Sequence, residues 1–264
     1  KENDMSITLG VDIGSSACKA VALRDGTEIV AQSLIQVGTG TSGPERVLRD
    51  IYAKTGLQQS DFAYTVVTGY GRYSLDIADK AVSEISCHSK GVHFLFPTAR
   101  TILDIGGQDC KAISIDENGA VQCFFMNDKC AAGTGRFIDN MARVLELSVE
   151  QMGEYDALST EKVVVSSTCT VFAESEVISL LSKKKKKEDI IYGIHDSVIS
   201  RAAGLLNRTH KQPDFVLTGG VAKNAGIRRA LEQELKQPVL VAQEPQMTGA
   251  LGAALYAWKY CEKK

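Results

Sequence analysis

A pattern of residues that occurs twice in the chain is the strongest constraint on its fold. The first copy is Ile7–Gly14 (ITLGVDIG) and the second is Thr101–Gly106 (TILDIG). Each is a short apolar run that presents an aspartate and then breaks into glycine, which is typical of a strand followed by a tight turn. Each continues into a second strand that opens on a lysine and ends in a hairpin turn, at Asp25-Gly26 and at Asn118-Gly119. A repeat this long is not a solenoid unit, so the sequence predicts two similar α/β subdomains.

The remaining segments complete an α/β pattern. A further apolar run, from Asp214 to Thr218, predicts a strand that ends in Gly219-Gly220. Apolar residues at helical spacing predict helices over residues 44–54, 136–147, 174–181, 189–208, 225–235 and 249–260.

Composition excludes several classes of protein. The 264 residues carry a formal charge of −2, so no basic field favours nucleic acid as a partner. No apolar run reaches the roughly 18 residues that mark a membrane span, and no apolar signal core follows the first residues. We therefore expect a cytoplasmic protein that binds neither membrane nor nucleic acid.

Seven cysteines are the unusual part of the composition. The number is odd, and none of them forms a C-x-x-C pair. This argues against a disulfide framework and against a zinc finger, which needs closely spaced ligand pairs. The open question is whether all seven are small structural residues or whether some carry chemistry.

Three turns rich in glycine indicate a nucleotide site. They follow predicted strands at Gly14, Gly106 and Gly219. Glycine lets main-chain N–H groups approach phosphate oxygens closely, and Asp12 and Asp104 are suited to a hydrated magnesium ion.

Neither a P-loop motif nor a G-x-G-x-x-G motif after the first strand is present. A single such turn is more often a plain tight turn, but three together favour a nucleotide. Ser15, Ser16 and Lys19 add hydrogen-bond donors and a cation to the first of them.

Cys130 and Cys169 each stand just before a predicted helix. A helix N-terminus favours a thiolate, and thiolates bind iron–sulfur clusters. Two cysteines cannot complete a four-thiolate site, whereas a two-fold dimer supplies four. The alternative is that both are buried structural thiols.

The glycine turns resemble known motifs. Asp12-Ile-Gly-Ser, Asp104-Ile-Gly-Gly-Gln-Asp and Thr218-Gly-Gly-Val-Ala are similar to the first phosphate, second phosphate and adenosine motifs of the sugar kinase, heat-shock ATPase and actin superfamily. This resemblance implies two duplicated ribonuclease-H-like subdomains of the actin-like ATPase fold, with ATP and Mg²⁺ in a cleft between them. We expect residues 5–98 and 246–262 to form subdomain I, and residues 99–245 to form subdomain II.

The two cysteine segments, 126–137 and 166–177, resemble the cluster-ligand motifs of the 2-hydroxyacyl-CoA dehydratase activators, within the BadF/BadG/BcrA/BcrD ATPase family. The resemblance extends from Met5 to Lys259. It implies a homodimer bridged by one 4Fe–4S cluster, with Cys130 and Cys169 of each chain as ligands. It also implies ATP hydrolysis that drives a low-potential electron from a ferredoxin or flavodoxin to an iron–sulfur dehydratase or reductase.

The family's site residues carry over to matching positions. Asp12, Asp104 and Gln108 are the candidate catalytic residues, although Gln108 could instead simply hydrogen-bond the nucleotide. The implied nucleotide contacts are Ser15, Ser16, Ala17, Cys18, Lys19, Gly106, Gln108, Gly219, Gly220 and Gln246.

Other interpretations remain open at this point. A small-molecule kinase of the same superfamily explains the glycine motifs but not the cysteine motifs, and a third possibility is a non-catalytic iron–sulfur or scaffold protein. Within the family, the partner can be a dehydratase, a benzoyl-CoA reductase or a double-cubane cluster protein. We expect His88 to lie at a polar helix end and Lys183 to Lys187 to form a solvated loop.

Overall fold

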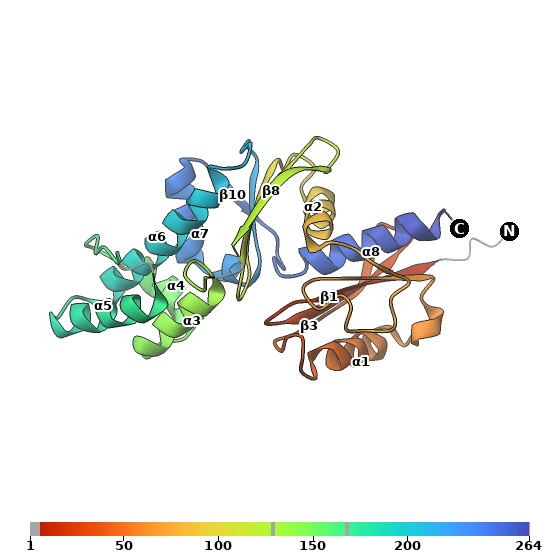
Figure 1. Ribbon diagram of the computed structural model, residues 1–264, viewed down its shortest axis with the longest axis horizontal. Coiled ribbons are helices and arrows are strands. Elements are labelled where there is room, and N and C mark those ends of the chain that lie inside the picture. The colour runs from red at the N-terminus through yellow and green to blue at the C-terminus, as the bar shows by residue number, and fades with distance from the viewer. Residues whose placement is uncertain (1–5, 128–129, 167–168, 264) are drawn as a thin grey trace. The chain divides into compact units, whose positions relative to one another are not determined.

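The chain forms two units, each built on a five-stranded sheet (Figure 1). The structure is a computed structural model and describes residues 6–127, 130–166 and 169–263. Unit 1 comprises Lys1–Ala99, Ile115–Val121 and Gln246–Lys264, and unit 2 comprises Arg100–Ser114 and Gln122–Pro245.

The described residues of unit 1 form five strands, three α-helices and a short 3₁₀ helix. The strands are β1 (Ile7–Ile13), β2 (Cys18–Arg24), β3 (Glu28–Ile35), β4 (Tyr64–Thr68) and β5 (Lys80–Ala81). The helices are α1 (Gly43–Thr55), η1 (Gln59–Asp61), α2 (Glu84–Leu95) and α8 (Thr248–Cys261).

Both faces of the first sheet are covered, because side chains alternate along its strands. Ala20 and Ala22 of β2 pack in one buried cluster with Val47 and Ile51 of α1. Val21 and Leu23, one residue further along, pack on the other face in a cluster with α8. Strands buried on both faces explain why these segments read as nearly continuous apolar runs.

Unit 2 repeats this sheet and adds more helices. Its strands are β6 (Thr101–Ile105), β7 (Cys110–Ile115), β8 (Val121–Asn127), β9 (Phe215–Thr218) and β10 (Val239–Val241). Its helices are α3 (Gly135–Val144), α4 (Val149–Asp156), α5 (Thr170–Ser182), α6 (Lys187–Leu206), η2 (Gly220–Lys223) and α7 (Ala225–Leu235).

The two sheets have the same topology. Their strand orders are β3-β2-β1-β4-β5 and β8-β7-β6-β9-β10. In each, the first strand pairs antiparallel with the second and parallel with the fourth, β4 or β9. The duplication that the sequence predicts is therefore present as two copies of one α/β sheet.

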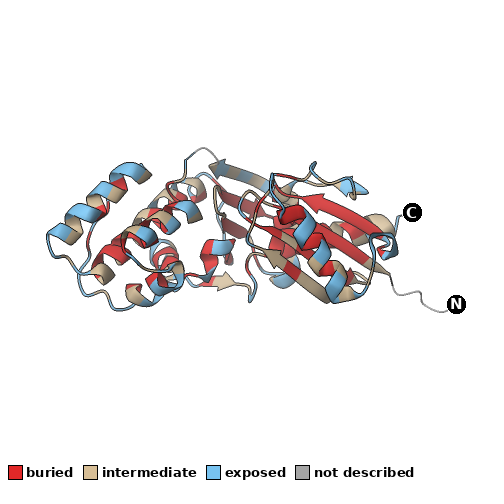
Figure 2. Ribbon diagram, turned by 90° about the horizontal axis from the view of Figure 1, so that it is seen from below, coloured by how far each residue is buried: buried red, intermediate tan, exposed pale blue. Residues whose placement is uncertain are grey.

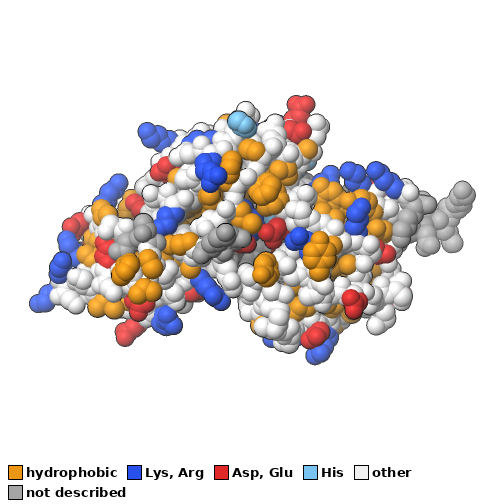
Figure 3. Space-filling model, viewed as in Figure 1, with side chains coloured by type: hydrophobic (Ala, Val, Ile, Leu, Met, Phe, Trp, Pro, Cys, Tyr) orange, Lys and Arg blue, Asp and Glu red, His pale blue; other side chains and the backbone are white. Residues whose placement is uncertain are grey.

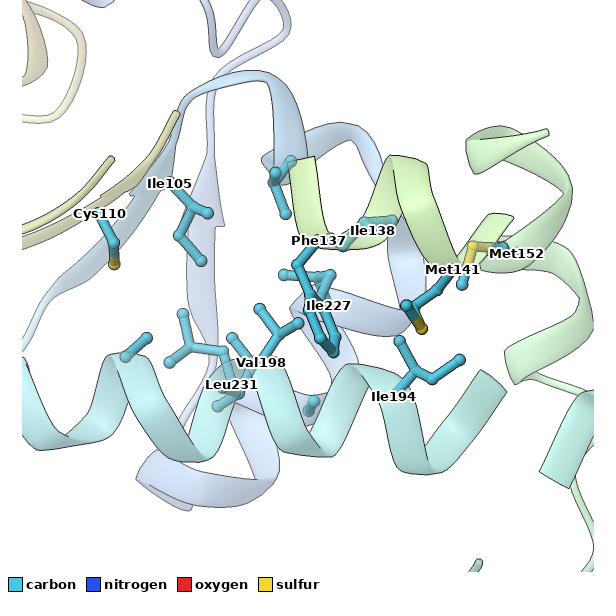
Figure 4. Close-up of a cluster of buried hydrophobic side chains, with 14 of the residues drawn as sticks. Ile105, Cys110, Phe137, Ile138, Met141, Met152, Ile194, Val198, Ile227 and Leu231 are labelled. Atoms are coloured by element: carbon cyan, nitrogen blue, oxygen red, sulfur yellow. The ribbon is translucent and has the colours of Figure 1, made fainter. Parts of the chain in front are cut away.

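The core of unit 2 lies between its sheet and the layer formed by α3, α6 and α7. Phe137, Ile138 and Met141 of α3 point toward Ile194 and Val198 of α6, as Figure 4 shows. In Figure 2 the strands are largely buried, while the helices are buried along one side and exposed along the other. This is the pattern expected of amphipathic helices that cover a sheet.

A buried polar network joins three helices of unit 2. His195 of α6 is fully buried, and its Nδ1 lies 2.7 Å from Oδ2 of Asp156 at the end of α4. Arg229 of α7 donates two hydrogen bonds to the same carboxylate, 3.0 and 2.7 Å long, and a third of 2.6 Å to Asp196. These contacts balance the negative charge of Asp156 and offset the free-energy cost of burying its carboxylate.

The N-cap of α7 determines the tautomer of His195. Asn224 Oδ1 accepts hydrogen bonds from the backbone N–H groups of Gly226 and Ile227, so its Nδ2 is the atom that faces His195 Nε2, at 3.2 Å. Because Nδ2 can only donate, Nε2 accepts and the proton lies on Nδ1, which donates to Asp156. The network therefore connects the α7 cap to both α4 and α6.

Six helices lie where the sequence predicts them, within a few residues, but the helix expected over 136–147 ends early. α3 stops at Val144, and Glu146 has a positive φ of 57°. Ser148 then starts α4 with a capping box, in which its side chain accepts from the Gln151 N–H. The spacing Ser148-x-x-Gln151 is a signal for a new helix start.

Helix α2 and the position of His88 correct another expectation. His88 does not lie at a helix end but is buried within α2, with Nδ1 3.1 Å from Oγ1 of Thr248. The buried face of α2 is rich in small and polar residues, including Ser89 and Gly91, so its apolar periodicity is weak. Within the described part of the chain, no helix has both the length and the apolar character needed to span a membrane.

We expect Asp156→Asn to lower the free energy of unfolding by about 3 kcal/mol, because it leaves the buried His195 and the half-buried Arg229 without their shared carboxylate. Arg229 keeps its bond to Asp196, which places the loss at the low end of the range for broken buried ion pairs. Urea denaturation followed by circular dichroism measures this. Glu154→Gln, an exposed change on α4, serves as control and should stay within about 0.5 kcal/mol of the wild type.

The contacts of Asp156 with His195 and Arg229 also predict that the free energy of unfolding depends on pH. Burial alone raises the pKa of Asp156, but hydrogen bonds from His195 and Arg229 outweigh it and hold that pKa below its ordinary value. Such a carboxyl stabilises the fold above its unfolded pKa of about 3.9, and this contribution is lost as the pH falls through the folded pKa. The difference between wild type and Asp156→Asn should shrink below about pH 4. A difference that stays constant into strong acid would contradict this assignment.

Candidate functional site

The turns after β1 and β6 have the same hydrogen-bonded shape. In the first, the Gly14 N–H donates to the Ala17 carbonyl, at 3.0 Å; in the second, the Gly106 N–H donates to the Asp109 carbonyl, at 2.9 Å. The residues at the two tips, Ser15-Ser16 and Gly107-Gln108, are partly or fully exposed. Backbone at each tip can thus approach an anionic ligand.

A second segment of each unit holds its turn in place. The Gly14 carbonyl accepts from the Thr39 N–H at 2.9 Å, and the Gly106 carbonyl accepts from the Gly135 N–H at 2.8 Å. Both predicted phosphate loops are therefore preformed within their own units. Such preorganisation lowers the entropy cost of binding.

Each loop is preceded by a buried aspartate that is paired with a lysine on the neighbouring strand. Asp12 lies opposite Lys19 in the β1–β2 register, and Lys19 Nζ is 3.1 Å from Asp12 Oδ2. Asp104 lies opposite Lys111 in the β6–β7 register, with the corresponding atoms 3.3 Å apart. The structure thus places Asp12 with Lys19 in unit 1, and Asp104 with Lys111 in unit 2.

In unit 2, two further side chains contact the Asp104–Lys111 pair. Lys111 Nζ is 2.8 Å from Asp109 Oδ2, so this lysine bridges two carboxylates. Thr218, at the end of β9, donates its hydroxyl proton to Asp104 Oδ1 over 2.8 Å. Gln108 precedes Asp109 in the loop and is half-buried.

The third glycine turn follows β9. Gly219 has a φ of 86° and donates its N–H to the Pro245 carbonyl at 3.1 Å. Gly220 is exposed and begins η2. Gln246, the last of the expected nucleotide contacts, follows Pro245 in the chain and is half-buried.

Unit 1 contains a counterpart of this turn, to which the sequence motifs alone assign no role. Thr68 lies opposite Asp12 in the β1–β4 register, as Thr218 lies opposite Asp104 in the β6–β9 register, and Gly69 follows Thr68 with a φ of 89°. A side-chain Cβ at Gly69 would collide with Asp12 Oδ1 and lie 2.6 Å from the Ile13 carbonyl. The signal was visible as Thr-Gly directly after an apolar strand in both halves.

Cys18 and Cys110 face the cores of their sheets. Both side chains are buried, and burial raises the pKa of Cys18 to about 11 and that of Cys110 to about 12. Cys87 is also buried, with a pKa raised to about 12. These thiols stay protonated at neutral pH, and Cys18 is fully buried, so it offers no thiolate to a nucleotide.

Cys130 and Cys169 differ from these three, because both are exposed. Cys169 is the N-cap of α5, and its carbonyl accepts from the Ala173 N–H at 2.9 Å. The expectation that Cys130 also heads a helix is wrong. Its loop closes in a turn, in which the Thr134 N–H donates to the Ala131 carbonyl at 3.0 Å, and α3 begins only at Gly135.

Four residues of the two cysteine motifs, Asp128, Lys129, Ser167 and Thr168, lie outside the described residues. In the described ranges, no three or more His, Cys, Asp or Glu side chains gather as one metal site. A single chain therefore offers two exposed thiols, which is half of a four-thiolate set. The donor chemistry suits a cluster that is shared by two chains.

Lys183 to Lys186 connect α5 to α6, and Lys187, the last of the lysine run, is the first residue of α6. Lys185 pairs with Glu161 at 2.6 Å, and Lys187 donates to the Leu145 carbonyl at 2.6 Å. Figure 3 shows positively charged side chains at the end of unit 2 that carries these two helices. This segment lies in the structure as the predicted surface loop.

Comparison with known proteins gives a family match over most of the chain. Residues 9–257 match the sequence profile of the BadF/BadG/BcrA/BcrD ATPase family. The chain is 58% identical to the activator of lactoyl-CoA dehydratase from Anaerotignum propionicum, over 97% of this chain and 99% of that protein. It is 56% identical to the (R)-2-hydroxyglutaryl-CoA dehydratase activating ATPase from Acidaminococcus fermentans, over 98% and 100% respectively.

Solved structures agree with this match. The structure of the 2-hydroxyisocaproyl-CoA dehydratase activator from Clostridium difficile with bound ADPNP superposes with a TM-score of 0.94. The two chains are 53% identical, and the alignment covers 97% of this chain and 96% of the other. A more distant relative is a component of benzoyl-CoA reductase from Thauera aromatica, 35% identical over 96% of this chain and 93% of that protein. The predicted actin-like ATPase fold class is confirmed.

The Thr-Gly turn of unit 1 can be tested with a matched pair of glycines. Gly40 also has a positive φ, of 74°, but no heavy atom lies within 4 Å of the position its Cβ would occupy. We expect Gly40→Ala to cost about 1 kcal/mol from backbone strain alone. Gly69→Ala should cost at least about 2 kcal/mol, because strain and displacement of Asp12 add together. Thermal unfolding measures both, and equal decreases in Tm would refute the role given to Gly69.

Proposed function

Because the chain belongs to the BadF/BadG/BcrA/BcrD ATPase family, we propose that it is an ATP-dependent activator that delivers low-potential electrons to a 2-hydroxyacyl-CoA dehydratase. The observation that carries the proposal is the pair of exposed cysteines, Cys130 and Cys169, in a chain 58% identical to such an activator. The same chain holds two preformed glycine loops with buried aspartate–lysine pairs. A plain kinase has no use for the cysteine motifs.

The first loop is proposed to bind phosphates of ATP. Ser15 and Ser16 would donate backbone and hydroxyl hydrogen bonds, and Ala17 and Cys18 would contribute backbone groups. Lys19 would supply the cation, since its Nζ already lies at the base of the loop beside Asp12. A lysine in this position acts as a point charge on a phosphate oxygen.

The second and third loops would complete nucleotide binding. Gly106 and Gln108 would contact phosphate, Gly219 and Gly220 would contact adenosine, and Gln246 would add a side-chain amide. The bound ADPNP in the Clostridium difficile activator structure supports a nucleotide of this class.

Hydrolysis needs a cation and a positioned water. We assign Asp12 and Asp104 to a hydrated Mg²⁺, because each is a buried carboxylate at a loop that would hold phosphate. Gln108 would orient the attacking water, as a glutamine does in other NTPases. The γ-phosphoryl group passes to that water, giving ADP and inorganic phosphate.

Cys130 and Cys169 of two chains would hold one 4Fe–4S cluster, which supplies one-electron chemistry when bound. Helix α5, which begins after Cys169, supports a homodimer. Val171, Phe172 and Ile178 on it are 68%, 69% and 50% exposed. Large apolar side chains on one helix indicate a surface that another protein covers.

The electron enters from a reduced ferredoxin or flavodoxin and leaves to an iron–sulfur protein partner. A 2-hydroxyacyl-CoA dehydratase is the acceptor we favour, because the relatives at 58% and 56% identity carry names of such activators. A benzoyl-CoA reductase or a double-cubane protein is the alternative acceptor, and the 35% identity to a reductase component makes it the weaker one. Anaerobic capture of the partner with ATP present, followed by the partner's own assay, separates these cases.

The cluster assignment predicts iron content. Anaerobically reconstituted wild type should hold about four iron and four sulfide per two chains, since four thiolates complete one cluster. Cys130→Ser and Cys169→Ser should each reduce both values to near zero. Cys123→Ser, a half-buried thiol on β8, is the matched control and should retain the wild-type content. Four iron atoms per two chains that persist in Cys130→Ser would contradict the proposal.

The hydrolysis assignment predicts a loss in turnover. Asp104→Asn keeps the shape of the side chain but removes its charge, and we expect kcat for ATP hydrolysis to fall roughly a hundredfold. Glu234→Gln makes the same chemical change on the exposed side of α7 and should leave kcat within about twofold. Steady-state phosphate release measures both. A wild-type rate in Asp104→Asn would remove Asp104 from the proposed machinery.

A further inference from the structure

Helix α6 lies against the loop that carries Cys130, and Arg201 is the point of contact. Gly133 of this loop has a φ of 88°, and a Cβ built on it would lie 3.4 Å from Cβ and 3.7 Å from Cδ of Arg201. The loop is fixed at its start by Asn127, whose Nδ2 lies 3.5 Å from the Cys130 carbonyl. The side chain of Arg201 therefore runs alongside the Cys130–Thr134 loop.

The guanidinium group of Arg201 is held in one position. Its Nη1 donates to the Ser197 carbonyl at 2.9 Å and to Ser197 Oγ at 2.6 Å. Its carbon lies 5.3 Å from the centre of the Phe137 ring, and Phe137 is fully buried in α3. A charge fixed in this way acts at a constant distance on its surroundings.

The charge of Arg201 acts on both cysteine segments. Burial lowers the pKa of Arg201, whereas its attraction to Cys130 and Glu176 raises it. Glu176 of α5 accepts from the backbone N–H of Ser166 at 3.1 Å and from Ser166 Oγ at 2.9 Å, and Ser166 is three residues before Cys169. Arg201 thus lies within electrostatic reach of Cys130 and of Glu176, the carboxylate that accepts hydrogen bonds from Ser166.

The surface beside this loop is positively charged. A cavity of about 360 Å³ is lined by Arg201, Gly204 and Arg208 of α6 and the turn after it, and by Met126 and Asn127 of β8. Arg201 and Gly204 are three residues apart on α6 and share one side of it, and Arg208 follows the end of the helix at Leu206. Among the described residues that line this cavity there is no carboxylate.

We propose that Arg201 is a positioning residue for the electron-transfer centre, whose fixed positive charge raises the reduction potential of the cluster held by Cys130 and Cys169. This inference rests on the proposed function. An iron–sulfur cluster bound by four thiolates is anionic and becomes more negative when it accepts an electron. A nearby cation stabilises the reduced state more than the oxidised one, so it favours reduction by the physiological donor.

Two substitutions of similar size separate charge from packing. Arg201→Lys keeps the charge and loses the planar group, while Arg201→Gln loses both. Arg143→Gln is the matched control, because Arg143 is an exposed arginine at the opposite end of α3 from the Cys130 loop. The midpoint potential of each reconstituted dimer is measured by anaerobic titration with dithionite, followed by electron paramagnetic resonance.

We expect the equilibrium constant for one-electron reduction to fall about tenfold in Arg201→Gln, which corresponds to about 59 mV toward more negative potential. Arg201→Lys should shift by less than half as much, and Arg143→Gln should match the wild type. Equal potentials in Arg201→Lys and Arg201→Gln, or a wild-type potential in Arg201→Gln, would overturn the inference.

Partial loading of a variant does not obscure the result, because the midpoint potential does not depend on how many dimers carry a cluster. Failure of the proposed function is also distinguishable. It would appear as absent iron in the wild type, whereas failure of this inference appears only in the potentials of the Arg201 variants.

Discussion

The pairing of a buried aspartate with a lysine on the adjacent strand is the interaction on which the rest of each unit depends. A carboxylate at the end of a central strand is expensive to bury without a cation. The lysine reaches the carboxylate only if the two strands pair in this register. The register in turn fixes the length of the glycine turn that connects them. The residue that follows the parallel strand on the other side must then be glycine, since a larger residue collides with the first strand or the carboxylate.

A second buried charge organises the helices of unit 2. Asp156 accepts from His195 and Arg229, and Asn224 completes the network from the cap of α7. Asn224 directly follows η2, which begins at Gly220 of the third glycine turn. Helix α6 carries both His195 of this network and Arg201 beside the Cys130 loop. One helix therefore contacts both the proposed adenosine segment and the proposed cluster segment of unit 2.

Much of the fold could be predicted from local signals. The duplicated strand–turn–strand pattern places β1, β2, β6 and β7 correctly, because period, turn residues and a terminal aspartate occur together. The long helices α1, α6 and α8 are found from their apolar spacing within two residues at each end. Helix α2 was missed, because its buried face uses small residues that give little hydropathy signal.

Some residues of the candidate site could be recognised from the sequence, and others could not. Gly14, Asp12, Gly106 and Asp104 stand out as motifs, and the family resemblance assigns Cys130 and Cys169. The start of α3 at Gly135 lies within one residue of the predicted start, and the Ala131–Thr134 turn separates Cys130 from this helix. Thr68 and Gly69 follow an apolar strand, but the sequence pattern by itself does not show that Gly69 lies against Asp12. Arg201 has no sequence signal at all, since it belongs to an ordinary helical surface.

The sequence by itself determined the duplication and the glycine turns, and it singled out two cysteine motifs among seven cysteines. These features are local, and a strand end, a tight turn or a motif can be recognised from a few adjacent residues. Only the tertiary structure decided which residues from distant segments meet: Thr218 with Asp104, His195 with Asp156, and Arg201 with the Cys130 loop. Such contacts depend on how helices and strands pack, and the spacing of residues along one segment carries no information about the partner that packs against it.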